Sequence, residues 1–469
     1  MLTWTANGDS RLSHWQRVRE FAVPPTMIEA ATARRHTGDW AGACAAAAVD
    51  IDFGLRHLAR THGRELMAEV RADLRHLAPD LLRWHLPRIA PDGLLRPGLT
   101  VELARYRATG PDGDRPVHLV ARTPPAWADA GQRISLGLWD SSQSEAAGWG
   151  PPHPRPHRRF RLDLHRHLWD ARRADELRIR SGADAVGPPA GPEPAGLLPP
   201  GYRCAVDRWA AEAAILLRAE GRSTSSGAGA VGVRLGARHR LVLELGGDVD
   251  GPGPSTLRIA KASPDRGGRR LPVLPDAATW VLPDLDLLRA GLIEADRLHP
   301  LVASALVPGR SPTAPSQLPS PTGQPQLVEC QGSLHRIGMV DGVLAPLDHD
   351  PAEIRREELL VALSGTPMPC LQAIDLAHRH PDCLVGVRER LDHGDIAGAL
   401  AVVEGLLGPD ALLRSGDLRD ELETAAHRRI SYGLFRAGLA GSGPGPHRDR
   451  TDGRRSAERR SRPRHALTY

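Results

Sequence analysis

The chain has 469 residues, enough for two to four domains of ordinary size. Hydrophobic residues make up 41% and charged residues 25%, which excludes a largely disordered chain. The net charge of +5 comes from the C-terminal segment 447–469, where eight arginines face three acidic residues. The rest of the chain is neutral, so its composition does not indicate that this part binds nucleic acid.

The cysteines and the N-terminus indicate the compartment. There are five cysteines, an odd number at wide spacing, and this favours reduced thiols over a disulfide framework. Residues 1–10 lack a basic patch leading into an apolar run, so we expect no secretory signal. Nowhere does an apolar run approach the roughly 18 residues of a membrane span. The sequence therefore predicts a cytoplasmic protein with no membrane segment.

Residues 12–88 have the pattern of a small helical bundle. Thr26-Met27-Ile28-Glu29 is a capping box after two prolines, and it predicts a helix that runs to His36. Further along, Leu66, Val70 and Leu74 recur every four residues and form one apolar stripe on a helix.

The middle of the chain alternates strand-like and helical patterns. Strands are predicted over 117–121, 134–139 and, most clearly, 159–169, where apolar and polar residues alternate. After a Pro/Gly-rich stretch, we expect a helix over 205–220 and strands over 240–245 and 256–261. One α+β module or two fit this pattern equally well.

The C-terminal part opens after a polar, Pro-rich linker. A hairpin is predicted over 334–347 with its turn at Asp341-Gly342, and Asp350-Pro351 predicts the start of a helix. Several more helices are expected up to about Leu439.

The fold class indicated is α+β multidomain, with helical N- and C-terminal modules around a central mixed α/β region. The expected divisions are a helical bundle over 1–97, a strand-rich module over 98–186, a Pro/Gly linker over 187–200, an α+β module over 201–307, a disordered linker over 308–326, a mainly helical module with an N-terminal hairpin over 327–440 and a disordered Arg-rich tail over 441–469.

Two short segments, 38–47 and 394–403, share a Gly-Asp pattern. In each, Gly is expected to end one helix and Asp to cap the next, with small residues following where helices approach closely. The segments resemble the turn and second helix of the tetratricopeptide repeat, with matches at Gly38, Asp39, Trp40, Ala43, Gly394, Asp395 and Ala399 and a departure at Ile396. The resemblance implies helix hairpins and peptide binding. Because the copies are 356 residues apart and not in tandem, ordinary bundle hairpins are the alternative.

Asp163, His165 and His167 form the candidate metal site. On a strand over 159–169 these side chains would share one face, with neighbours roughly 6.6–7 Å apart. Two histidines so placed could chelate a metal, with His153 or His157 as a further ligand. A solvated strand face is the simpler interpretation of the same pattern.

Three other patterns have ordinary explanations. Cys370, His378, His380 and Cys383 could be zinc ligands, but the spacing equally fits a buried thiol and surface histidines. The glycine run 227–232 matches a dinucleotide-binding pattern. That motif needs a strand before it and a helix after it, and the sequence predicts neither, so we expect a loop and no cofactor. Asp284 and Asp286, beside Trp280-Val281-Leu282, could be a metal-binding strand end, but the start of a helix explains them more simply.

No nucleophile elbow, Walker A loop or zinc-protease motif occurs in the sequence. The hypothesis favoured by the sequence is a non-catalytic protein-interaction or scaffold/accessory protein with protein partners. The alternative is a metal-dependent hydrolase using Asp163, His165 and His167, so the sequence does not decide whether the protein is an enzyme. Nucleic-acid binding is expected only weakly, through the Arg-rich tail.

Overall fold

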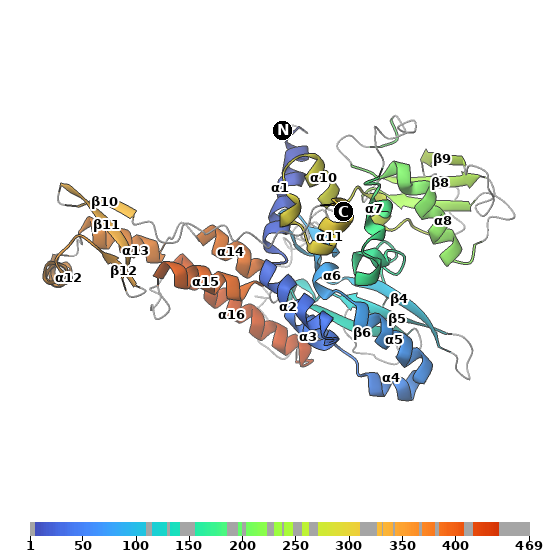
Figure 1. Cartoon of the computed structure of the whole chain (residues 1–469), viewed down its shortest axis with the longest axis horizontal. Coiled ribbons are helices and arrows are strands. Elements are labelled where there is room, and N and C mark those ends of the chain that lie inside the picture. The colour runs from blue at the N-terminus through green and yellow to red at the C-terminus, as the bar shows by residue number, and fades with distance from the viewer. Residues whose placement is uncertain are drawn as a thin grey trace, which may run out of the picture. The chain divides into compact units, whose positions relative to one another are not determined.

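The computed structural model describes most of the chain and divides it into two compact units (Figure 1). Unit 1 comprises the described residues of 1–126 and 133–315, and unit 2 those of 127–132 and 316–449. The described residues are 5–108, 115–128, 132–140, 155–184, 196–198, 203–222, 229–236, 239–246, 256–261, 271–309, 326–330, 332–340, 343–364, 368–379, 384–407 and 416–439. The fold is a mixture of helices and several small sheets.

The N-terminal part of unit 1 is helical, as the pattern predicts. Its helices are α1 (Thr5–Phe21), α2 (Pro25–His36), α3 (Trp40–Ala46), α4 (Leu55–His62), α5 (Arg64–His76) and α6 (Pro79–His85). The predicted stripe of α5 is confirmed, because Leu66, Val70 and Leu74 are all buried. These helices belong to the same hydrophobic core as the strands that follow them.

A four-stranded sheet follows, in the order β1-β6-β5-β4. Its strands are β1 (Val49–Ile51), β4 (Thr100–Ala108), β5 (Arg115–Arg122) and β6 (Ile134–Asp140). A small hairpin of β2 (Arg88–Ile89) and β3 (Leu94–Leu95) lies between β1 and β4 in the chain. The predicted strands over 117–121 and 134–139 are confirmed. Strand β1 comes from the N-terminal helical region of the sequence and pairs in parallel with β6, with Val49 opposite Ile134. No sequence pattern predicted this three-residue strand.

The strand expected over 159–169 is wrong. This segment forms a series of turns and the short helix η2 (Arg166–Leu168). Local hydrogen bonds link Phe160 N to His157 O, His165 N to Leu162 O and Leu168 N to His165 O, each closing a turn. Of the apolar side chains that alternate in the sequence, Phe160, Leu162 and Leu168 are buried and Leu164 is half-buried. The indole of the buried Trp169 donates to Leu162 O at 3.0 Å, a contact that an extended strand over 159–169 could not make.

The second half of unit 1 holds a three-stranded antiparallel sheet and a covering helix. The sheet, in the order β7-β8-β9, contains β7 (Gly229–Arg234), β8 (Arg240–Gly246) and β9 (Thr256–Lys261). Helix α8 (Trp209–Ala219) lies beside it and shares its core (Figure 1). The strands predicted over 240–245 and 256–261 are therefore confirmed. The loop expected over 227–232 is wrong from Gly229 onward, since Val231 and Val233 alternate as buried strand residues.

Four further helices complete the described part of unit 1: α7 (Glu176–Ser181), α9 (Asp276–Thr279), α10 (Pro283–Arg289) and α11 (Pro300–Leu306). Asp284 and Asp286 lie in the first turn of α10, as predicted, and both are buried. These aspartates do more than cap α10, because each forms an ion pair with arginine. Asp284 pairs with Arg19, and Asp286 pairs with Arg11 and Arg203.

Unit 2 combines a β-meander with helices. Its elements are β10 (Gln326–Cys330), β11 (Ser333–Val340), β12 (Val343–Pro346), α12 (Pro351–Ser364), α13 (Pro369–Arg379), α14 (Leu384–His393), α15 (Ile396–Leu407) and α16 (Asp417–Arg436). The hairpin predicted over 334–347 is confirmed by the antiparallel pairing of β11 with β12. Its turn at Asp341-Gly342 and the tail beyond residue 441 lie outside the described residues.

Both Gly-Asp segments form helix hairpins, as predicted, and their geometry is nearly the same. Gly38 and Gly394 adopt φ angles of 76° and 86°, which favour glycine. In the first hairpin Gly42 N donates to Oδ1 of Asp39 at 2.8 Å. In the second, Gly398 N donates to Oδ1 of Asp395 at 2.9 Å.

Each Gly-Asp turn is also tied to the helix before it. Arg34, near the end of α2, donates to the Asp39 carboxylate at 2.9 Å, and Arg390, in α14, donates to Asp395 at 3.0 Å. The two turns therefore share an arginine five residues before the capping aspartate. The repeated sequence pattern corresponds to a repeated local structure, once in each unit.

Candidate functional site

In the structure, the side chains of Asp163 and His165 have different partners. Arg161 donates to both carboxylate oxygens of Asp163, at 2.9 and 2.7 Å. His165 Nδ1 lies 3.1 Å from the Arg161 carbonyl oxygen, and its Nε2 lies 3.2 Å from the Glu212 carboxylate. Within the described ranges, Asp163, His165 and His167 do not form a group of metal-ligand atoms.

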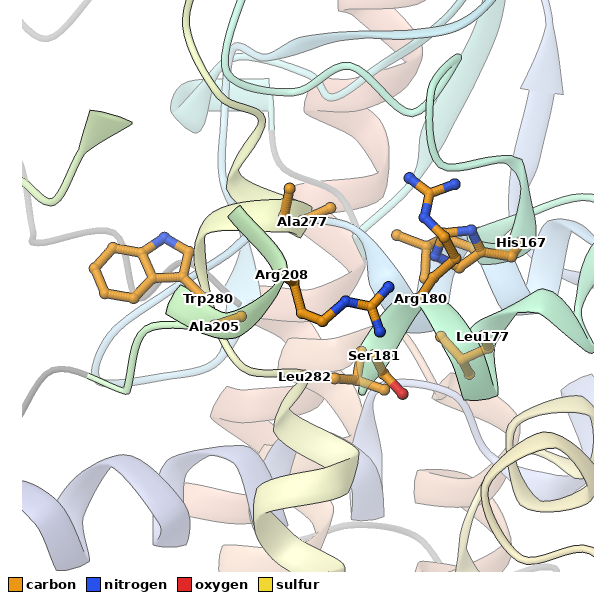
Figure 2. Close-up of a pocket in the computed structure, with 11 residues that line it drawn as sticks. His167, Leu177, Arg180, Ser181, Ala205, Arg208, Ala277, Trp280 and Leu282 are labelled. Atoms are coloured by element: carbon orange, nitrogen blue, oxygen red, sulfur yellow. The ribbon is translucent and has the colours of Figure 1, made fainter. Parts of the chain in front are cut away.

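His167 is fully enclosed. Burial, followed by the nearby charge of His165, holds the pKa of His167 well below its ordinary value, so its imidazole is neutral near pH 7. The side chain lines a cavity of about 20 Å³ together with Arg180 and Trp280 (Figure 2). This space accommodates about one water molecule, too little for a substrate.

Glu212 of α8 neutralises the charges beside His165. Arg180 of α7 donates to both of its carboxylate oxygens, at 2.6 and 2.7 Å. Burial raises the pKa of Glu212, but His165 and Arg180 outweigh burial and lower this pKa to about 2. The cluster joins α7 to α8 across the core, so its role in the fold is structural.

A larger cavity, of about 360 Å³, lies elsewhere in unit 1. We call it the arginine pocket because five arginines line it: Arg105, Arg155, Arg158, Arg161 and Arg222. Its walls come from β4, β5 and β6, from the segment before residue 162, from the end of α8 and from residues 271–273. Two carboxylates, Glu102 and Glu220, also line it.

Glu102 is a buried carboxylate in the wall of the arginine pocket that binds three neighbouring side chains. Its Oε1 lies 2.7 Å from His118 Nδ1 and accepts from Arg105 Nε at 3.0 Å, while Arg161 Nε lies 3.4 Å from Oε2. Burial raises the pKa of Glu102, but the His118 hydrogen bond and the Arg161 charge outweigh burial and lower this pKa to about 2. Glu102 is therefore ionised at every physiological pH.

The charge balance of the arginine pocket favours anions. Glu102 and Glu220 are already engaged by Arg161, whereas Arg155, Arg158 and Arg222 are exposed to solvent. Guanidinium groups bind carboxylate and phosphate oxygens in pairs. Trp139 packs its ring edge-to-face with His118 at 5.0 Å and adds an apolar wall. The pocket can hold a small anion that carries an apolar part.

Unit 2 contains the metal-ligand group found among the described residues: Cys330, His349 and Cys370, with donor atoms all within 4.8 Å of one another. Burial, with Cys330 alongside, raises the pKa of the Cys370 thiol to about 11. Cys370 was one of the four residues considered as zinc ligands from the sequence. His380 and Cys383 lie outside the described residues, and for His378 only the backbone is described. Cys330 and His349 were missed, because the chain separates them from Cys370 by 40 and 21 residues.

Comparison with protein-family models, curated proteins and solved structures gave no match. Among the helices in the described part of the chain, none has the length and apolar character needed to cross a bilayer.

Proposed function

We propose that this is a cytoplasmic, non-catalytic accessory protein that binds a partner protein through the C-terminal part of α16. The observation that carries the proposal is a stripe of exposed apolar side chains. Ile430, Leu434 and Leu439 are 61%, 44% and 53% exposed. Ile430 and Leu434 are four residues apart, so they lie next to each other on one helical face. Leu439 follows three residues after the end of α16. We call these three residues the α16 stripe.

The α16 stripe is not needed for the packing of α16 itself. The helix buries Leu418, Ala425 and Tyr432, which recur every seven residues on one face. Positions 430 and 434 are each two residues from Tyr432, about 200° around the helix axis, and so point away from that face. Exposed apolar side chains that lie next to each other, as Ile430 and Leu434 do, are typical of a protein-binding site.

The charges beside the α16 stripe indicate the partner's chemistry. Arg429 and Arg436 are exposed next to the apolar side chains. An amphipathic helix with acidic residues flanking its apolar face would complement this surface by packing against α16. The resemblance of the α14–α15 hairpin to the peptide-binding tetratricopeptide repeat supports the same proposal.

The test has two stages. A photo-crosslinking amino acid replaces Ser431, and mass spectrometry identifies the protein captured in the native host. The purified candidate is then titrated against the full chain by calorimetry. We expect the double variant Ile430→Asp and Leu434→Asp to weaken binding at least tenfold. Ile179→Asp, at a position in unit 1 that is 64% exposed, is the matched control and should leave the affinity unchanged.

Two results would overturn the proposal. One is equal affinity of the double variant and the wild-type chain for the purified candidate. The other is capture of a second copy of this chain, with a dimer mass by light scattering that the double variant reduces to a monomer. The second result would assign the α16 stripe to self-association.

A second candidate function is the binding of a small organic anion in the arginine pocket, and the exposed Arg158 and Arg222 favour it. Citrate and a nucleoside monophosphate should raise the melting temperature of the wild-type chain. The rise should be lost in Arg158→Gln and Arg222→Gln and kept in Arg71→Gln, an exposed arginine on α5. An equal rise in all four proteins would indicate nonspecific anion binding.

The metal-dependent hydrolase remains the weaker alternative. A metal at Asp163 would have to displace Arg161 from both carboxylate oxygens. His165 and His167 would also need to leave buried positions.

A further inference from the structure

We propose that unit 2 binds one zinc ion through Cys330, His349 and Cys370, with His335 as the fourth donor. Thiolate and imidazole groups are the usual ligands of structural zinc. In a tetrahedral zinc site with these bond lengths, ligand atoms lie roughly 3.3–3.8 Å from one another. The donor atoms of Cys330, His349 and Cys370 are within 4.8 Å of one another, so a contraction of about an ångström completes the geometry.

The environment of His349 points to an ion. Its Nε2 is buried and has no hydrogen-bond partner among the described residues. Its Nδ1 lies 3.5 Å from Oε2 of Glu353, on the first turn of α12. A buried nitrogen without a hydrogen-bond partner destabilises the folded chain, and a bound metal ion would remove that cost. A metal-bound histidine usually donates its other nitrogen to a carboxylate, and Glu353 is placed to accept that bond.

His335 supplies a second unpaired imidazole at the same place. Its ring stacks on that of His349, with centroids 4.1 Å apart and an interplanar angle of 11°. Its Nδ1 is also buried without a partner in the described part of the chain. The donor group whose atoms lie within 4.8 Å of one another does not include His335, so its imidazole has to move toward the ion to complete a Cys₂His₂ donor set.

The zinc would join parts of unit 2 that share little apolar core. Cys330 ends β10, His335 lies on β11, His349 precedes α12, and Cys370 lies in the first turn of α13. Among the described residues, the core cluster around them contains five buried residues: Cys330, Ile337, Met368, Cys370 and Ile374. Small cores commonly depend on a metal or a disulfide for stability, because they bury too little apolar surface. A bound zinc ion would cross-link the meander to the helices.

The first experiment measures metal in the full-length wild-type chain, purified in reducing buffer without chelator. We expect one zinc per chain by elemental analysis, and an intense thiolate charge-transfer band when Co²⁺ replaces zinc. Zinc should also protect Cys330 and Cys370 from alkylation, as mapped by mass spectrometry before and after chelation. The buried Cys44 should show no such difference, which separates metal protection from simple burial.

The second experiment compares variants. Cys330→Ser, Cys370→Ser and His349→Gln should each lose stoichiometric zinc. Cys204→Ser is the matched control, because Cys204 lies in unit 1, and it should keep its zinc. His335→Gln should still bind Co²⁺, with weaker affinity and a shifted spectrum. Because this variant keeps three ligands, it tests the site even if the cysteine variants fail to fold.

Two outcomes would overturn the zinc site. One is a reduced wild-type chain that takes up no zinc, with Cys330 and Cys370 equally reactive with and without Zn²⁺. The other is a Cys330–Cys370 disulfide in the purified protein that, once reduced, leaves thiols with no affinity for Zn²⁺ or Co²⁺. Either result leaves the proposed role of the α16 stripe untouched, because that stripe contains no zinc ligand.

Discussion

The guanidinium of Arg19 and the carboxylate of Asp284 form two parallel hydrogen bonds of 2.8 Å that join α1 to α10. Both side chains are almost completely buried. Trp84 of α6 completes the arrangement: its indole donates to Asp284 at 3.0 Å, and the Arg19 guanidinium lies 4.5 Å from its ring centroid. Three helices therefore meet at one charge pair inside unit 1.

Removing one partner of this pair should be strongly destabilising. Asp284→Asn leaves the Arg19 charge buried without a counter-charge, and we expect a loss of about 3–5 kcal/mol in the free energy of unfolding. The double variant Arg19→Met and Asp284→Leu should recover most of that loss, because it leaves no buried charge. Arg419→Met, which breaks an exposed pair with Glu423, should cost less than about 1 kcal/mol. Urea unfolding measures all three, and a double variant no more stable than Asp284→Asn would contradict the expectation.

His85 should make stability depend on pH. Both of its ring nitrogens are buried without a partner among the described residues, and burial lowers its pKa to about 3. The unfolded chain, with a pKa near 6.5, binds this proton more readily than the folded chain does. Stability from this residue is therefore complete above about pH 6.5 and falls as the pH decreases toward 3.

The variant His85→Leu isolates that contribution. Between pH 4 and 6.5 its free energy of unfolding should rise less steeply with pH than that of the wild-type chain. His57→Gln, at an exposed position on α4, is the control and should keep the wild-type slope. His157 and the buried His167 also have lowered pKa values and act in the same direction, so some slope should remain. Equal slopes in His85→Leu and wild type would show that His85 titrates normally in the fold.

Glu212 should contribute stability at neutral pH that disappears in acid. Its pKa is lowered to about 2, so its contribution is complete above the unfolded pKa near 4.5 and is lost as the pH falls through 2. We expect Glu212→Gln to cost about 3 kcal/mol at pH 7 and much less near pH 2. Chemical denaturation at the two pH values measures the difference, and a cost independent of pH would assign the effect to packing alone.

The Gly-Asp turns should show strong coupling between two positions. Asp395→Ala should cost about 1 kcal/mol, the usual value for loss of an N-cap. A Cβ added at Gly398 would overlap the Asp395 carboxylate and displace the same cap. The double variant Asp395→Ala and Gly398→Ala should therefore be less destabilised than the sum of the single variants. Asp39 and Gly42 in unit 1 provide an independent repeat, and simple additivity in both turns would contradict the geometry.

Local patterns in the sequence predicted the local structure well. Turn and cap signals in neighbouring residues were enough to predict several elements. These are the Gly-Asp hairpins, the strands over 240–245 and 256–261, and the hairpin of β11 and β12. The segment 159–169 shows the limit of such reasoning. Alternating apolar residues fit a strand, but here most of them reach the core through a series of turns, and the Trp169 indole donates to the backbone carbonyl oxygen of Leu162.

The candidate sites depend on contacts that no local pattern contains. Cys330 and Cys370 come together only after the meander packs on α13, and Glu102 meets Arg161 only after β4 packs against the turns after residue 155. The prediction at Asp163 failed to include Arg161 as its partner, although the two residues are only two positions apart. A strand would also place the two side chains on one face, but the strand pattern alone does not show that they form an ion pair.

The parallel pairing of β1 with β6 has a consequence for synthesis of the chain. Val49 is made about 85 residues before its partner Ile134, a delay of about 4–17 s at roughly 5–20 residues per second. During that interval, the apolar faces of α3 and α5 lack the sheet on which they pack in the finished protein. The emerging N-terminal segment therefore exposes apolar surface until β6 has been translated and the sheet can close over it.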